Sequence, residues 1–256
     1  MSAQRHLPSY YSSLAPFREL FEQGNPILTY HKVGPRPKRV RLKGLYLSAA
    51  LFRRQLIELK AAGFQSGSLS DYSGPLKPRQ IVLTFDDGYV NVLRNAVDAL
   101  AQTQFKAVQF IPVNFVGKSN EWDIALGEAS EPILDSSQIR DWLAAGHDIG
   151  SHTLTHPFLT RLEPRQAREE IFASRKKLED LFGRAIEHFC YPYGDWNAAV
   201  RDWVMEAGYQ TASTTDFGVN TPETSAFALK RITARYRSRS FKALLERIRL
   251  LSVWCA

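Results

Sequence analysis

The sequence predicts a single-domain α/β fold in which a parallel sheet closes into a (β/α) barrel. Short apolar runs alternate with longer helical patterns, and such alternation is typical of parallel sheets. Seven strand-like runs can be counted, one short of an eight-stranded barrel. The 256 residues suffice for one large domain but not for two comfortable α/β domains. An open, doubly wound sheet is the alternative architecture.

Each expected strand is a short apolar run. The runs span residues 26–31, 81–85, 107–111, 147–151, 188–191, 209–213 and 227–232. Ser48 is expected to cap the first helix and Gly63 to stop it, while Val92, Ala96 and Leu100 give the second helix one apolar face. The later helices are expected to begin at Ser136 or Ser137, at Pro164 and at Asn197.

Three segments follow from this pattern. Residues 1–25 form an N-terminal flank, residues 26–235 form the barrel, and residues 236–256 form a basic amphipathic helix packed on it. Within the barrel, residues 112–135 show weak periodicity and are interpreted as a long loop, which is often a functional feature.

Composition narrows the class of protein. Hydrophobic residues make up 44% and charged residues 23%, which is typical of a soluble globular chain. The formal net charge of +7 favours anionic partners, but no basic run carries a nucleic-acid motif, so nucleic acid is not expected as a partner. Membrane contact through the basic C-terminal helix is a weaker alternative to packing on the barrel. The oligomeric state is not predicted.

Two cysteines, Cys190 and Cys255, exclude a disulfide scaffold and fit a reducing compartment. The first thirty residues lack the apolar core of a signal peptide, and no stretch is long enough to span a bilayer. A cytoplasmic location is therefore expected, unless a targeting segment precedes this sequence.

The sharpest motif is LTFDDGY at residues 83–89, where Asp86 and Asp87 follow an expected strand. Adjacent carboxylates repel each other, so a fold that holds both usually supplies a metal or a proton. On its own, such a motif is commonly a solvated turn. A second motif places His152 and His156 after another strand, at a spacing that suits one metal ion. Because strand ends converge on one face of a barrel, the two motifs together favour a shared site.

These motifs resemble those of the polysaccharide deacetylases, carbohydrate esterase family 4. A third segment, FCYPYG at residues 189–194, is similar to another motif of that family, and the resemblance covers about residues 26–235. The resemblance implies a distorted (β/α)7 barrel. It also implies that Asp87, His152 and His156 hold one divalent metal, that Asp86 is the general base, and that the backbone N–H of Tyr193 contributes to an oxyanion hole.

Two departures from the family pattern matter. Many members take an acid histidine from a C-terminal motif, but no histidine follows His188 here. The segment around His31 instead resembles the N-terminal strand of the circularly permuted branch that includes poly-N-acetylglucosamine deacetylases, which implies His31 as general acid. The alternative is a histidine that only packs at a strand end.

Cys190 stands where many members have an arginine that orients the base, so Arg231 is the candidate for that role. A surface salt bridge is the alternative for Arg231.

Three aromatic residues are candidates for stacking on sugar rings: Tyr191, Trp196 and Trp122. Ordinary packing is the alternative for each.

The leading functional hypothesis is hydrolysis of an N-acetyl amide on a glycan, a glycolipid or a nucleotide-linked sugar. A related C–N hydrolase acting on a cyclic imide, ureide or formamide, and a non-catalytic carbohydrate-binding barrel, are the alternatives. Zinc is the default metal from the ligand types, with iron, cobalt or nickel as further options.

Overall fold

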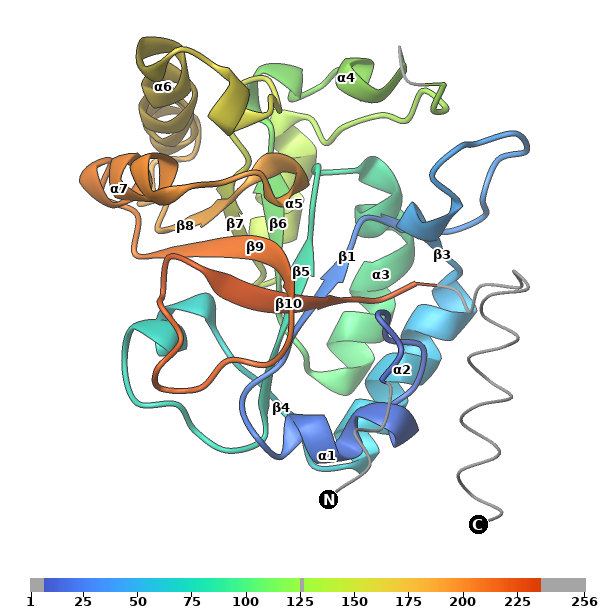
Figure 1. The fold of residues 1–256 in the computed structure, drawn as a ribbon. Helices are drawn as coiled ribbons and strands as arrows, with labels where there is room; N and C mark the ends of the chain where they lie inside the picture. Colours follow the sequence, from blue (N-terminus) through green and yellow to red (C-terminus); the bar gives the residue numbers. More distant parts are fainter. Residues whose placement is uncertain (1–6, 125–126, 236–256) are drawn as a thin grey trace.

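A computed structural model describes residues 7–124 and 127–235 and contains a closed parallel barrel (Figure 1). The first strand pairs with two neighbours, since Leu28 lies opposite Leu83 on one side and opposite Ile232 on the other. The barrel strands are β1 (Ile27–Tyr30), β5 (Gln80–Phe85), β6 (Ala107–Ile111), β7 (Asp148–Ser151), β8 (His188–Cys190), β9 (Thr211–Phe217) and β10 (Leu229–Thr233). The predicted seven-stranded barrel is thereby confirmed, and the alternative of an open sheet is wrong.

Three short strands lie outside the closed ring. Strand β4 (Gln65–Ser66) pairs with the beginning of β5. Strands β2 (Lys32–Val33) and β3 (Tyr46–Leu47) pair with each other directly after β1. The barrel strands themselves are buried along most of their length, which explains why they read as continuous apolar runs in the sequence.

Helices surround the barrel (Figure 1), and their buried apolar side chains share one core cluster with those of the strands. The longer ones are α2 (Ala49–Ala61), α3 (Val90–Thr103), α5 (Ser136–Ala144), α6 (Pro164–Phe182) and α7 (Ala198–Glu206), and the short ones are α1 (Arg18–Phe21) and α4 (Glu121–Ile124). The predicted caps Ser48 and Asn197 each accept a backbone N–H in the first turn of their helix.

The predicted cap of α5 is wrong by one residue. Asp135, not Ser136 or Ser137, accepts the backbone N–H of Gln138 at 2.8 Å. In return, the N–H of Asp135 donates to the side-chain oxygen of Gln138 at 3.0 Å. This reciprocal capping box satisfies two backbone donors, so it fixes the start of the helix better than a serine one position later.

The described part of the N-terminal flank packs onto the barrel through its buried aromatic residues. Tyr11 and Phe17 are fully buried, and the N–H of Tyr11 donates to the carbonyl of Thr233 at 2.8 Å. The division into flank, barrel and terminal helix stays a prediction, and the helix expected over residues 236–256 lies outside the described residues. Within the described residues, no helix is long and apolar enough to cross a bilayer.

The expected loop between β6 and α5 contains the short helix α4 and is tied to the site. Ile133 forms an antiparallel bridge with Tyr89, and the N–H of Leu134 donates to the carbonyl of Gly88 at 2.9 Å. This segment therefore lies against the turn that follows β5, at the carboxyl ends of the barrel strands. That edge of the barrel carries the candidate site.

Candidate metal centre

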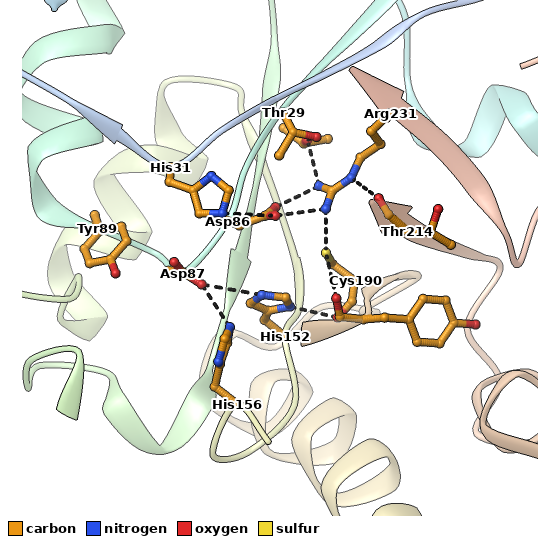
Figure 2. Close-up of polar contacts among 12 residues, drawn as sticks. Thr29, His31, Asp86, Asp87, Tyr89, His152, His156, Cys190, Thr214 and Arg231 are labelled. Carbon is orange, nitrogen blue, oxygen red and sulfur yellow. Dashed lines mark hydrogen bonds and ion pairs between the residues drawn. The ribbon is translucent and has the colours of Figure 1, made fainter. Parts of the chain in front are cut away.

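The turn after β5 separates two neighbouring carboxylates. Asp87 and Gly88 both adopt left-handed backbone conformations, with φ of 73° and 69°. A side chain at Gly88 would lie 2.9 Å from the Cδ1 atom of Ile111, so only glycine fits there without movement. The turn lets Asp86 and Asp87 contact different partners although they are adjacent in the chain (Figure 2). Left-handed backbone at a non-glycine residue is costly and is typical of functional sites.

The two histidines of the second motif lie on the loop after β7. Glu170 on α6 holds this loop, because its carboxylate accepts the N–H groups of Leu154 at 2.8 Å and Thr155 at 2.9 Å. The Nδ1 atom of His152 lies 2.8 Å from the carbonyl oxygen of Cys190. Since a carbonyl only accepts, Nδ1 carries the hydrogen, and the free lone pair of the neutral ring is on Nε2.

Asp87, His152 and His156 converge on one point (Figure 2). The Oδ1 atom of Asp87 lies 3.5 Å from Nε2 of His152 and 3.2 Å from Nε2 of His156. All three residues are buried, and one ligand atom from each lies within 4.8 Å of the others. Within the described residues, the Oδ1 atom of Asp87 has no hydrogen-bond donor. A buried carboxylate oxygen facing two imidazole nitrogens fits a cation such as a divalent metal.

The charges around this point favour a cation. Burial opposes the ionised form of Asp87, but the adjacent imidazoles of His152 and His156 outweigh it and hold the pKa of Asp87 well below its ordinary value. Burial lowers the pKa of His152, yet Cys190 and the two aspartates raise it well above its ordinary value. Surroundings that attract a proton so strongly also attract a metal ion in its place.

A second set of potential ligands overlaps the first and is already occupied by protein contacts. Asp86, His152 and Cys190 also lie within 4.8 Å of one another. However, Arg231 donates to both carboxylate oxygens of Asp86, at 2.8 and 2.9 Å, and approaches the sulfur of Cys190 at 3.1 Å. A second cation there would compete with the guanidinium, so the set containing Asp87 is the better metal site.

Asp86 and Arg231 form a buried, bidentate ion pair (Figure 2). Both are at most 4% exposed, and the remaining donors of Arg231 reach the Thr214 carbonyl at 2.7 Å and the Thr84 hydroxyl at 3.1 Å. Burial raises the pKa of Asp86, but Arg231, together with His31 and His152, outweighs burial and lowers that pKa below its ordinary value. The structure thus brings Arg231 to the predicted base, and the alternative of a surface salt bridge does not fit this burial.

His31 lies at the end of β1, on the other side of Asp86. Its Nε2 atom is 3.8 Å from Oδ2 of Asp86, and 20% of its side chain is exposed. Burial lowers the pKa of His31, and the nearby Asp86 and Asp87 carboxylates offset part of that effect. The imidazole therefore borders the predicted base Asp86 while remaining partly open to solvent, which a residue that exchanges protons requires.

Tyr193 lies beside His156 in a left-handed turn. Its φ is 59°, and its ring centroid is 4.5 Å from that of His156. A side chain at Gly194 would meet the hydroxyl of Thr215 at 1.9 Å, so the turn requires glycine. The ring of Tyr193 stacks on Phe158 with centroids 3.9 Å apart. This packing holds the ring of Tyr193 next to His156, one of the candidate ligands.

The three aromatic candidates for sugar stacking lie in different surroundings. Trp122 is half-buried and stacks on His156, with centroids 4.9 Å apart. Trp196 is half-buried and stacks on Tyr191 at 5.8 Å. Tyr191 is fully buried, and its hydroxyl donates to the Phe227 carbonyl at 3.0 Å. Tyr191 therefore has no free face for a sugar in this structure, whereas Trp122 lies against a metal-ligand candidate.

Sequence reasoning missed Lys32, which is fully buried although it is a lysine. Its ammonium lies 4.7 Å from the ring centroid of Tyr46 and 4.5 Å from that of Tyr89. Burial lowers the pKa of Lys32, and Asp87 is the first of the carboxylates that oppose this effect. A lysine two residues after the continuous buried strand β1 was the available signal, since lysine is rarely buried without a partner.

Comparisons with known proteins agree with this geometry. A family profile described as polysaccharide deacetylase matches residues 73–212. YxkH of Bacillus subtilis, whose name describes a polysaccharide deacetylase, is 27% identical over 81% of this chain and 70% of its own length. A chitooligosaccharide deacetylase from a Bradyrhizobium species is 30% identical over 51% of this chain, and the match spans about half (53%) of that relative. The crystal structure of a polysaccharide deacetylase from Bacillus cereus superposes with a TM-score of 0.70 and 25% identity, covering 89% of this chain and 70% of that one.

Proposed function

The chain belongs to the polysaccharide deacetylase family, and from this premise we propose that it hydrolyses an N-acetyl amide on a sugar and releases acetate. The observation that carries this proposal is the convergence of Asp87, His152 and His156 on one buried point, with the ion pair of Asp86 and Arg231 beside it. Three protein ligands with open positions are the arrangement of catalytic rather than structural metal sites.

The three ligands would hold one divalent metal. When bound there, such a metal acts as a Lewis acid that polarises the amide carbonyl and makes water more acidic. Two imidazoles and one carboxylate suit zinc, and iron, cobalt and nickel accept the same ligands. Zinc is the default within this proposal.

Asp86 would act as the general base. Arg231 donates to both of its oxygens and keeps the carboxylate ionised, so it can take the proton of the attacking water. The water oxygen then bonds to the acetyl carbon. Because Arg231 fixes the plane of the carboxylate, Asp86 is held in position before substrate arrives.

His31 would donate the proton that the leaving amine needs when the C–N bond breaks. Its imidazole borders Asp86 at 3.8 Å, so the two proposed proton-transfer groups are neighbours. The backbone N–H of Tyr193 would stabilise the negative charge that develops on the carbonyl oxygen. Acetate and a free amine on the sugar are the products.

The substrate class proposed is an N-acetylated sugar. Relatives are named for chitooligosaccharides and for N-acetylglucosamine of peptidoglycan, and both names describe N-acetylated sugars. Trp122, stacked on His156, is the aromatic best placed to contact such a ring. A cytoplasmic location and the absence of a nucleic-acid partner stay predictions.

The test compares Asp87→Ala with Asp86→Asn in the full chain. Asp87→Ala should lose both bound metal and acetate release, because it removes the carboxylate ligand. Asp86→Asn should keep the metal and lose acetate release by about 10²–10⁴-fold, as expected for a general base. Metal content by mass spectrometry and acetate release from N-acetylglucosamine oligomers are the measurements. Normal turnover in either variant would contradict the proposal.

A further inference from the structure

The chain makes an excursion between β2 and β3 that we call the basic arm, residues 34–45. It carries five cations and no carboxylate, and all five cations are exposed. They are Arg36, Lys38, Arg39, Arg41 and Lys43. Figure 1 shows the arm as the blue loop that projects from the molecule next to β3. A run of like charges repels itself and is commonly an interaction segment.

The arm is fixed at its base and along its return path. The N–H of Gly34 donates to the carbonyl of Leu47 at 2.7 Å, which closes the base. Further along, the N–H of Leu42 donates to the buried carboxylate of Glu128 at 2.5 Å. The hydroxyl of Tyr46 donates to Glu131 at 2.9 Å. These bonds hold the five cations at a defined place on the protein.

The cations of the arm differ from those on α6 and α7 in whether they pair with carboxylates. On α6 and α7, basic side chains pair with carboxylates: Arg168 with Glu206 at 2.5 Å and Lys176 with Asp180 at 2.8 Å are examples. In the part of the chain that the structure describes, none of the five arm cations forms an ion pair or a side-chain hydrogen bond. The arm is therefore an unneutralised positive surface that an anionic ligand would complement.

The arm also starts at the candidate site. Only Lys32 and Val33 separate it from His31, which lies 3.8 Å from Asp86. Arg36 is five residues beyond His31, and five extended residues span at most about 18 Å. A glycan that places one sugar at the metal ligands and continues for a few units can thus reach the arm.

We propose that the basic arm binds the acidic groups of the substrate, which is an N-acetylated glycan that carries carboxylates or phosphates. This proposal rests on the proposed deacetylase function and names its substrate class. A neutral glycan would gain nothing from five unpaired cations, whereas an acidic glycan gains attraction along its length. A membrane surface fits less well, because Leu42 is the arm's one large apolar side chain that is exposed, and interfacial segments bury a broad apolar face.

The experiment removes three arm charges and compares the result with an equal change elsewhere. The arm variant carries Arg36→Gln, Arg39→Gln and Arg41→Gln. The matched control carries Arg168→Gln, Lys176→Gln and Arg201→Gln, three exposed cations of α6 and α7 that pair with carboxylates. Both triple variants lower the net charge equally. The probes are a labelled oligosaccharide of alternating N-acetylglucosamine and glucuronate, and neutral chitohexaose of matched length.

Binding is measured by fluorescence anisotropy, which does not depend on turnover, and acetate release is measured in parallel. The arm variant should bind the acidic probe about tenfold more weakly at low salt, with chitohexaose unaffected and the control variant unchanged. The difference should vanish at high ionic strength, since salt screens exposed charges.

Equal weakening for both probes, or by both variants, would overturn the arm as an acidic-glycan site. Unchanged glycan binding together with lost sedimentation on phosphatidylglycerol vesicles would assign the arm to a membrane instead. If the unmodified protein binds the acidic probe through the arm yet releases acetate from neither probe, the deacetylase proposal fails while the binding site stands.

Discussion

Histidines are buried at both ends of the barrel strands, but their surroundings differ. At the amino ends, the Nδ1 atom of His188 bonds to the hydroxyl of Thr211 at 2.9 Å, and His147 packs against Trp142 with centroids 4.2 Å apart. At the carboxyl ends, His152 and His156 direct their Nε2 atoms at the Oδ1 atom of Asp87, which has no hydrogen-bond donor among the described residues.

This difference distinguishes histidines that only pack in the core from histidines that could bind a metal ion. Burial alone does not distinguish the two ends, since His147, His152, His156 and His188 are each at most 6% exposed. What distinguishes them is whether the lone pairs meet at a shared point next to a carboxylate. The carboxyl end also concentrates left-handed, non-glycine backbone, at Asp87, Thr153, His156 and Tyr193. Such strain persists only where surrounding contacts hold it.

The largest expected effect comes from breaking the buried ion pair at the carboxyl end. Arg231→Met should destabilise the fold by about 3–5 kcal/mol, because it leaves Asp86 buried without a counter-charge. Acetate release should fall together with the stability. Arg231→Lys should restore the charge but not the bidentate geometry. Urea denaturation and acetate release are the measurements.

A matched pair lies on the surface. Arg168 forms a similar two-pronged contact with Glu206, but both side chains are exposed. Arg168→Met should leave the unfolding free energy nearly unchanged, because solvent and salt screen that pair. Equal destabilisation by both changes would show that burial does not set the strength of the Asp86 contact.

A smaller effect is expected from the histidine that borders Asp86. His31→Gln should lower kcat by about 10²-fold, the usual contribution of a proton donor, while metal content stays unchanged. The matched change at the other end, His188→Gln, should reduce thermal stability through the lost bond to Thr211 and leave kcat intact. A normal kcat in His31→Gln would remove that residue from the mechanism.

The smallest effect is a pH dependence of the unfolding free energy that comes from His147, at the amino ends of the barrel strands. Burial, with a contribution from Lys106, lowers the pKa of His147 from 6.5 to about 4. As the pH falls below 6.5, the unfolded chain takes up a proton that the folded chain resists, so stability is lost toward pH 4. The loss from this residue should be about 2 kcal/mol between pH 7 and pH 5.

His147→Phe should lose correspondingly less stability over the same interval, measured as unfolding free energy in urea at each pH. Asp123 acts in the opposite direction, because burial and the neighbouring Asp87 raise its pKa to about 6 and favour its protonated form in the fold. The comparison between variant and unmodified protein cancels that contribution. An identical pH dependence in both would contradict the assignment to His147.

The sequence by itself predicted those features that depend on residues close together in the chain. Hydrophobic period and cap residues identified the seven barrel strands and several helix ends, but not the short strands β2, β3 and β4, because hydrophobic spacing and capping depend on neighbours a few residues apart. The Asp-Asp-Gly and His-x-x-x-His motifs placed four site residues after two strands, and the barrel explains why they meet. The cap of α5 was displaced by one residue, since serine and aspartate both cap helices and only the reciprocal bond with Gln138 selects Asp135.

Tertiary structure alone decided which distant side chains are partners. The sequence suggested Arg231 as the cation that orients Asp86, but it could not show that the two side chains meet. They are 145 residues apart in the chain, and only closure of the barrel sets their 2.8 Å contact. Tyr191 was a candidate for stacking on sugar, with ordinary packing as the alternative, and the closed barrel buries it completely. The partners of Lys32, and the absence of ion pairs along the basic arm among the described residues, likewise follow only from the fold, because composition fixes the number of charges while the fold fixes what faces each of them.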